Sequence, residues 1–165
     1  MFVSVDLATS GDSDLLFALW QIYMQELAEF RDYLVKVEGQ YRDDRLRTYL
    51  AYEDHWAFII RNNEVIAGFA LVRKSKPQTH LIGEFFIKPE FRNIGYSAAA
   101  VEQILQKFIG NWEIPFQEEN PRAARFWRKT IAELGFVASE DRLPVVGKPD
   151  QPADVWLYFS NSLDR

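Results

Sequence analysis

Apolar and polar residues first alternate along this chain and then recur at helical spacing. Residues 2–8, FVSVDLA, alternate as a short strand does, and the polar TSGDSD that follows offers several helix-capping side chains. One apolar face then recurs at three- and four-residue steps over about five turns, which predicts a long helix, and Gly39 is expected to end that region. This face comprises Leu15, Leu16, Leu19, Trp20, Tyr23, Leu27, Phe30 and Leu34. A shorter helix is predicted around residues 43–52.

The middle of the chain has the composition of strands. HWAFIIRNNEVIAGFALVRKS predicts two strands that form a hairpin, because β-rich runs flank the polar tetrad at residues 61–64. HLIGEFFIK is too short and too rich in aromatic residues to favour a helix, and it ends at Pro89. We therefore expect a central strand there.

The second half alternates between helices and strands. A helix is predicted over residues 97–109, closed by Gly110, and NWEIPFQ predicts a strand whose Pro115 interrupts the ladder. Asn120 caps a last helix that ends at Gly135. GFVAS and DVWLYFS are expected to be the final strands, joined by a polar loop over residues 140–153.

This order of elements predicts one α/β domain over residues 1–165, since the length fits a single core. We expect a central mixed, mainly antiparallel sheet of about seven strands with helices on both faces. Aromatic residues make up 15% of the chain, which favours a large aromatic core or a ligand cleft.

Composition excludes several classes of function. The formal net charge of −5 argues against general nucleic-acid binding, and the absence of cysteine excludes disulfides, thiolate metal sites and a cysteine nucleophile. His55 and His80 are far apart, so no metal site is expected. No apolar run approaches membrane-spanning length, and the start does not resemble a signal peptide, so we expect a cytoplasmic protein without a membrane partner.

The stretch EFFIKPEFRNIGYSAAAVEQIL, residues 84–105, carries the strongest chemical signal. A strand leads through a turn with Gly95 into a helix, and the free amides of a helix's first turn attract anions. Gly95 would let a phosphate approach and Arg92 could add charge, although many such turns contain glycine for conformational reasons alone. The stretch lacks both the dinucleotide G-x-G-x-x-G pattern and the P-loop ending, so neither NAD nor ATP is indicated.

Two phrases of this sequence resemble the GNAT-type (Gcn5-related) N-acetyltransferase family. KPEFRNIGYSAAAVEQIL is similar to the family's acyl-CoA loop, with Arg92, Gly95 and Ser97 on the motif positions and Ser97 replacing the usual small residue. NPRAARFWRKTIAELGF resembles the family's later helix. Its matching residues are Asn120, Ala123, Phe126 and Trp127. Residues 11–55 match only as helices.

The resemblance implies a splayed pair of central strands, here those ending at Lys88 and Gln117, with acetyl-CoA in the opening. Its pantetheine would bond to the backbone near Phe86 and Ile87, and the amides of residues 92–97 would hold the pyrophosphate. The implied cofactor-binding residues are Phe86, Ile87, Arg92, Asn93, Ile94, Gly95, Tyr96, Ser97, Asn120 and Trp127.

The implied chemistry is direct attack of a neutral amine on the thioester, which needs a base. Glu84 is the candidate, because strand alternation would place it on one face with Ile82 and Phe86, where desolvation would raise the pKa of its carboxyl. The alternative is a structural Glu84 paired with an Arg or Lys on a neighbouring strand.

Trp127 departs from the family pattern, in which a Tyr at this position can protonate the departing thiolate. Tyr96 and Tyr158 are nominal substitutes without positional support. We therefore keep three hypotheses: an acetyl-CoA-dependent N-acetyltransferase for a small amine or an exposed amino group, a catalytically weak acyl-CoA sensor, and an interaction domain in which Gly95 is only a turn residue. Acidic residues in the first helices could favour a cationic acceptor, and dimer formation stays open. These residues are Glu26, Glu29, Asp32, Asp43 and Asp44.

Overall fold

The computed structural model describes residues 2–92 and 95–163. The described chain runs through the predicted sequence of elements, with two short 3₁₀ turns, Ser10–Asp12 and Pro89–Phe91, in addition. The helices are α1 (Ser13–Leu27), α2 (Asp44–Ala51), α3 (Tyr96–Leu105) and α4 (Pro121–Glu133). The strands are β1 (Val3–Leu7), β2 (His55–Asn62), β3 (Val65–Lys76), β4 (Thr79–Ile87), β5 (Asn111–Gln117), β6 (Ser139–Leu143) and β7 (Asp154–Ser160).

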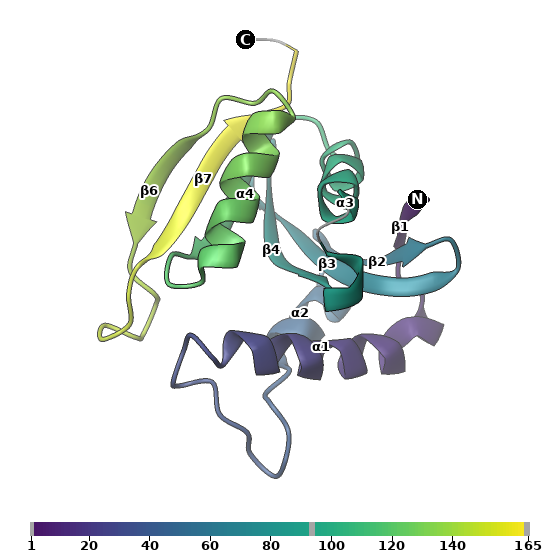
Figure 1. The fold of residues 1–165 in the computed structure, drawn as a ribbon, viewed down its shortest axis with the longest axis vertical. Helices are drawn as coiled ribbons and strands as arrows, with labels where there is room; N and C mark the ends of the chain where they lie inside the picture. Colours follow the sequence, from purple (N-terminus) through teal and green to yellow (C-terminus); the bar gives the residue numbers. More distant parts are fainter. Residues whose placement is uncertain (1, 93–94, 164–165) are drawn as a thin grey trace.

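All seven strands form one sheet in the order β1-β2-β3-β4-β5-β7-β6 (Figure 1). The β4–β5 pair is parallel and every other neighbouring pair is antiparallel. The prediction of a mixed, mainly antiparallel sheet is therefore confirmed.

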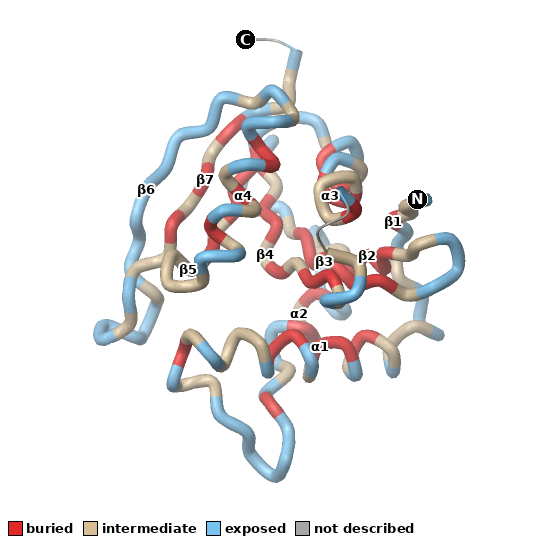
Figure 2. Tube along the Cα trace, in the orientation of Figure 1, coloured by how far each residue is buried: buried red, intermediate tan, exposed pale blue. Residues whose placement is uncertain are grey.

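The helices cover both faces of this sheet, as expected. Leu16 and Trp20 of α1 and Leu46 of α2 pack with Phe69 and Phe86 in one buried cluster. A second cluster joins α3 and α4 to the opposite face, and Figure 2 shows the buried segments concentrated along the central strands. The described part of the chain contains no helix with the length and apolarity to cross a membrane.

The first helix is shorter than its hydrophobic pattern predicted. Helix α1 ends at Leu27, and residues 28–43 form a long connection to α2 in which Phe30 and Leu34 are only partly buried. Within this connection Arg31 is 1% exposed and binds the carboxylates of Glu119 and Asp154. These ion pairs anchor the connection to the turn between β5 and α4 and to the start of β7, which apolar spacing alone cannot reveal.

The sixth strand was also misplaced by the sequence. We expected a loop over residues 140–153, but Ser139–Leu143 forms β6, which pairs with β7 along its whole length. All five of its residues are exposed, so this edge strand has no buried face to produce an apolar alternation. The GFVAS phrase carries only the first residue of that strand.

The two central strands part in the middle of the sheet. Strand β4 pairs with β5 only through Thr79–Leu81, opposite Asn111–Glu113, whereas β5 pairs with β7 along its full length. Pro115, which has no N–H to donate, lies two residues beyond Glu113, the last residue of β5 that pairs with β4. The predicted splay is confirmed, and it leaves one edge of β4 free beyond Leu81.

Candidate active site

A cleft of about 750 Å³ opens between the parted strands, bordered by α1, α3 and α4. It brings together most of the residues that the sequence predicted: Glu84, Phe86, Ile87, Arg92, Gly95, Ser97, Asn120 and Trp127. Tyr96 does not line the cleft, because its side chain is fully buried in the α3–α4 cluster. Asn93 and Ile94 lie outside the described residues.

The N-terminus of α3 faces this cleft. Gly95 precedes the helix with φ +74°, a left-handed conformation that disfavours other residues, and its carbonyl accepts from the amide of Ala99 at 3.2 Å. Among the described residues, no side chain caps the helix. Apart from its chain neighbours, a Cβ at Gly95 would meet no described atom within 4 Å. The first-turn amides therefore border open space that can receive an anion.

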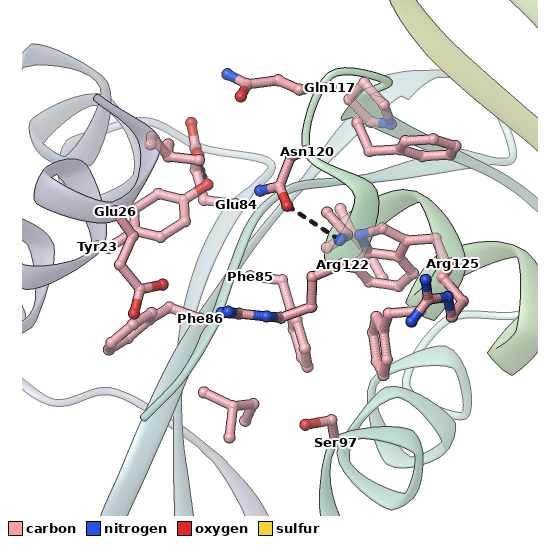
Figure 3. Close-up of a pocket in the computed structure, with 18 of the residues that line it drawn as sticks. Tyr23, Glu26, Glu84, Phe85, Phe86, Ser97, Gln117, Asn120, Arg122 and Arg125 are labelled. Atoms are coloured by element: carbon pink, nitrogen blue, oxygen red, sulfur yellow. Dashed lines mark hydrogen bonds between the residues drawn. The ribbon is translucent and has the colours of Figure 1, made fainter. Parts of the chain in front are cut away.

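Helix α4 forms the opposite wall. Asn120 caps it, with Oδ1 accepting from the Ala123 amide at 3.2 Å. Figure 3 shows Arg122 and Arg125 on this wall, with Arg122 extending into the opening. Both are exposed, and neither has an ion-pair partner among the residues described, whereas Arg128 on the same helix is held by two glutamates. Two uncompensated cations thus border the cleft.

Arg92 is already engaged within the protein. Its Nε donates to the Ile87 carbonyl at 2.7 Å, and its Nη2 donates to the Glu26 carboxylate of α1 at 2.8 Å. The side chain lies at the cleft edge with its charge balanced by Glu26. This pairing ties the turn before α3 to α1.

A bulge in β4 determines where Glu84 points. The register with β3 pairs Leu71 with Glu84 and Val72 with Ile82, so Gly83 is an extra residue and the alternation changes phase there. Ile82 belongs to the α3–α4 cluster, and Phe86 belongs to the α1–α2 cluster. The expectation that Glu84 shares a face with both Ile82 and Phe86 was therefore wrong.

Glu84 is a buried, ion-paired carboxylate. Its Oε1 accepts from Arg45 Nε of α2 at 2.8 Å, and its Oε2 accepts from the Tyr23 hydroxyl of α1. Burial, followed by the negative charge of Glu84, raises the pKa of Tyr23 well above its usual value. The sequence alternative of a paired Glu84 is thus present in the structure, with the partner on a helix and not on a neighbouring strand.

The phenol side chains that line the described part of the cleft are Tyr23 and Tyr33. Trp127 is 6% exposed and packs edge-on against Phe85, with ring centroids 5.2 Å apart. Tyr158 is on β7 and is not part of the lining. An indole N–H is no practical acid, so position 127 cannot protonate a leaving thiolate.

Sequence reasoning missed Tyr23, Arg45 and Arg31. Tyr23 was assigned only to the apolar face of α1, and Arg45 is one of several charged residues on a short helix. Arg31 lines one end of the cleft with Asp154, which its Nη2 contacts at 2.7 Å. Their partners are 39 to 123 positions away in sequence, so local patterns carry no signal for these contacts.

Comparison with known proteins identifies the family. The family model described as acetyltransferase (GNAT) family matches residues 17–131. The chain belongs to this family. Among curated proteins no sequence is similar enough to count as a match. No group of three or more metal-binding side chains occurs within the described ranges.

Several solved structures described as acetyltransferases or putative acetyltransferases share the fold at low sequence identity. An acetyltransferase from Thermus thermophilus is 18% identical with a TM-score of 0.67, and 96% of each chain is covered. The ribosomal-protein-S18-alanine N-acetyltransferase from Escherichia coli is 12% identical with a TM-score of 0.66, over 99% of this chain and 97% of that one. The yncA protein from Salmonella typhimurium, solved with its cofactor acetyl-CoA, is 15% identical with a TM-score of 0.64, over 99% and 95%.

Proposed function

We propose that this GNAT protein is an acetyl-CoA-dependent N-acetyltransferase that acetylates a primary amine of a small molecule or an exposed amino group. The observation that carries the proposal is the free edge of β4 beyond Leu81, which borders the same cleft as the N-terminus of α3. Backbone groups on this edge near Phe86 and Ile87, where the Ile87 carbonyl also accepts from Arg92 Nε, can bond to the amide groups of an extended pantetheine chain. The membership of the family supports acetyl-CoA as the donor.

The phosphates of the donor would lie at the first turn of α3. Gly95 leaves room for them, the amides of residues 95–98 can donate to them, and Ser97 lines the cleft close by. Arg122 and Arg125 can add charge-assisted contacts because neither is neutralised within the described protein. Arg92 positions this turn through its ion pair with Glu26.

The transfer proceeds by direct attack. The amine nitrogen forms a bond to the thioester carbon, the C–S bond breaks, and the sulfur departs as a thiolate. Glu84 accepts the proton of the amine, directly or through a water molecule, and Tyr23 and Arg45 hold its carboxylate in place. Trp127 donates no proton, so water protonates the thiolate.

Calorimetry with acetyl-CoA and a thiol-release assay with a broad amine panel test this proposal. We expect saturable binding and thiol release well above the hydrolysis background. The absence of binding at up to millimolar acetyl-CoA would contradict it.

A second candidate function is a catalytically weak acyl-CoA sensor, which the Trp127 substitution favours. Such a protein would bind acetyl-CoA but release no thiol above background with any amine of the panel. Gly95→Glu separates both candidates from a plain interaction domain, since only in that domain would the cofactor affinity stay unchanged.

A further inference from the structure

A second, smaller cavity lies beside the bulge of β4, and we call it the arginine pocket. Its volume is about 280 Å³, and it shares Arg45, Gly83, Glu84 and Pro115 with the main cleft. It is also lined by Tyr49, His55, Arg73, Leu81 and Trp156. Because Glu84 borders both cavities, a molecule in the arginine pocket can reach the carboxylate that also lines the main cleft.

The charge of this pocket is positive, although the chain carries a net charge of −5. Arg45 and Arg73 line it, and Glu84 is its one carboxylate among the described residues. Arg45 neutralises Glu84 at 2.8 Å, whereas Arg73 forms no ion pair with any described residue and lies near the phenol of Tyr49. A partly buried guanidinium without an anion is costly, so this position favours an anionic ligand.

Tyr49 cannot supply that anion. Burial raises the pKa of its hydroxyl to about 12, so the phenol is neutral at physiological pH. The hydroxyl lies against the bulge glycine, since a Cβ at Gly83 would lie 2.1 Å from it. Gly83 thus leaves room for Tyr49 beside Arg73 as a neutral wall of the pocket.

The acidic residues that suggested a cationic acceptor are largely engaged elsewhere. Glu26, Asp43 and Asp44 each form an ion pair with an arginine, and Asp32 accepts from Gln151 at 2.9 Å. The charges of Glu26, Asp43 and Asp44 are compensated by these ion pairs and add little attraction for a polyamine, whereas Asp32 keeps its charge because Gln151 is neutral.

We propose that the acceptor is a small amino acid-like molecule, whose carboxylate binds Arg73 and Arg45 while its nearby primary amine meets Glu84. This inference rests on the proposed acetyltransferase function and specifies its acceptor. The planar guanidinium of Arg73 matches a carboxylate in a bidentate manner. Leu81, Pro115 and Trp156 provide an apolar wall for the acceptor's side chain. A pocket of about 280 Å³ suits a molecule smaller than typical drug-sized ligands.

Matched acceptors test the inference on the full chain. The twenty common amino acids are assayed for thiol release beside their amides, together with spermidine and a short peptide with a free N-terminus. An amide has the less basic amine, so chemistry alone favours it over the acid. We expect at least one acid to exceed its own amide about tenfold or more in kcat/KM, because a charge-assisted contact is worth that much.

Variants of Arg73 test whether the preference for an acid over its amide arises in the arginine pocket. Arg73→Gln should lower kcat/KM for the acid about 10- to 100-fold and leave the value for the amide unchanged, whereas Arg73→Lys should lose less because it keeps the charge. Arg61→Gln is the matched control, since Arg61 lies on the same sheet and its ion pair among the described residues is a distant one, with Asp12 at 3.8 Å. Its acid-to-amide ratio should equal that of the unmodified protein. Circular dichroism melts confirm that each variant is folded.

Three results of the kinetic comparison would overturn the inference: equal or better use of amides, a preference for spermidine or the peptide, or equal losses for acid and amide in Arg73→Gln. Binding is measured as well, by calorimetry with each acid in the presence of acetyl-CoA, and no acid bound or turned over also overturns it. Acetyl-CoA affinity of the unmodified protein is determined separately. Its absence contradicts the proposed function itself, whereas intact cofactor binding with a different acceptor preference contradicts only the inference about the acceptor.

Discussion

The side chains of Glu84 on β4 and Arg45 on α2 form an ion pair at the wall between the two cavities, with 2.8 Å between Oε1 and Nε. Arg45 is 49% exposed and its partner only 10%, so the pair links a buried carboxylate to an accessible cation. The positive charge of Arg45 compensates Glu84 while part of its guanidinium remains available to a ligand. A single arginine can therefore orient the base and take part in acceptor binding.

Glu84→Gln is expected to lower kcat about 10²- to 10⁴-fold, because an amide cannot accept the amine's proton. The affinity for acetyl-CoA should change little, since the proposed donor contacts lie on the backbone and on α3 and α4. Thiol-release kinetics and calorimetry measure the two effects. Tyr23→Phe is the comparison variant: it removes one hydrogen bond that positions Glu84 but leaves the carboxylate and Arg45 in place, so it should lower kcat less than Glu84→Gln. Activity of Glu84→Gln within twofold of the unmodified protein would leave Glu84 with a structural role only.

Tyr49→Phe should reduce the loss of unfolding free energy that occurs as the pH becomes alkaline. Burial raises the pKa of Tyr49 from 10.0 to about 12, so its contribution is fully present below pH 10 and is lost as the pH rises through 12. This difference between the folded and unfolded pKa of Tyr49 corresponds to about 2–3 kcal/mol in the free energy of unfolding. Urea unfolding of both proteins at several values between pH 9 and 12 measures it. Parallel curves over this range would show that the Tyr49 hydroxyl titrates as it does in the unfolded chain.

Gly95→Ala is expected to weaken acetyl-CoA binding beyond its effect on folding. An alanine at φ +74° costs about 1–2 kcal/mol of stability, and its methyl group enters the space that a phosphate would use. Gly147→Ala is a closely matched control, with φ +73° and no atom within 4 Å of a Cβ, in the loop between β6 and β7. Both variants should lose similar stability in urea, whereas only Gly95→Ala should lose cofactor affinity. Equal acetyl-CoA affinities of Gly95→Ala and the unmodified protein would show that the phosphates do not bind at this turn.

Local patterns were sufficient for most of the fold and for one side of the site. Periodicity located all four helices, and the Gly95 and Asn120 phrases located the elements that border the donor cleft. The charged side of the site could not be predicted in this way. The phase of β4 depends on a bulge at Gly83, and this bulge accommodates the hydroxyl of Tyr49 from another element.

The errors in the fold have the same physical origin. Strand β6 has no buried face, so its pairing with β7 leaves no apolar alternation in the sequence. The end of α1 at Leu27 is followed by a connection that Arg31 anchors through partners 88 and 123 positions away. Hydrophobic periodicity reports burial, whereas these features depend on backbone pairing and on ion pairs.

Arg122→Gln and Arg125→Gln should each weaken acetyl-CoA binding about 5- to 30-fold at low salt, because each removes a cation that is unpaired within the described protein. The losses should shrink as ionic strength rises, and they should be absent for acetyl-pantetheine, which has no phosphates. Calorimetry over a salt series measures both trends. Arg128→Gln is the control on the same helix, since Glu118 and Glu140 already hold Arg128 outside the cleft lining. A loss that is the same at all salt concentrations would point to packing and not to charge.

Arg31→Met is expected to lower the free energy of unfolding by about 2–4 kcal/mol, because Arg31 is 1% exposed and its loss leaves Glu119 and Asp154 uncompensated. Burial outweighs Arg31 and raises the pKa of Asp154, so the ionised form of this carboxyl is disfavoured even in the intact pair. Asp154→Asn should therefore cost less than Arg31→Met, and the double variant should regain part of the stability that Arg31→Met loses. Urea unfolding of the three variants at pH 7 completes the double-mutant cycle. Strictly additive changes would show that Arg31 and Asp154 stabilise the fold independently, and the connection after α1 would then be held by packing and by Glu119.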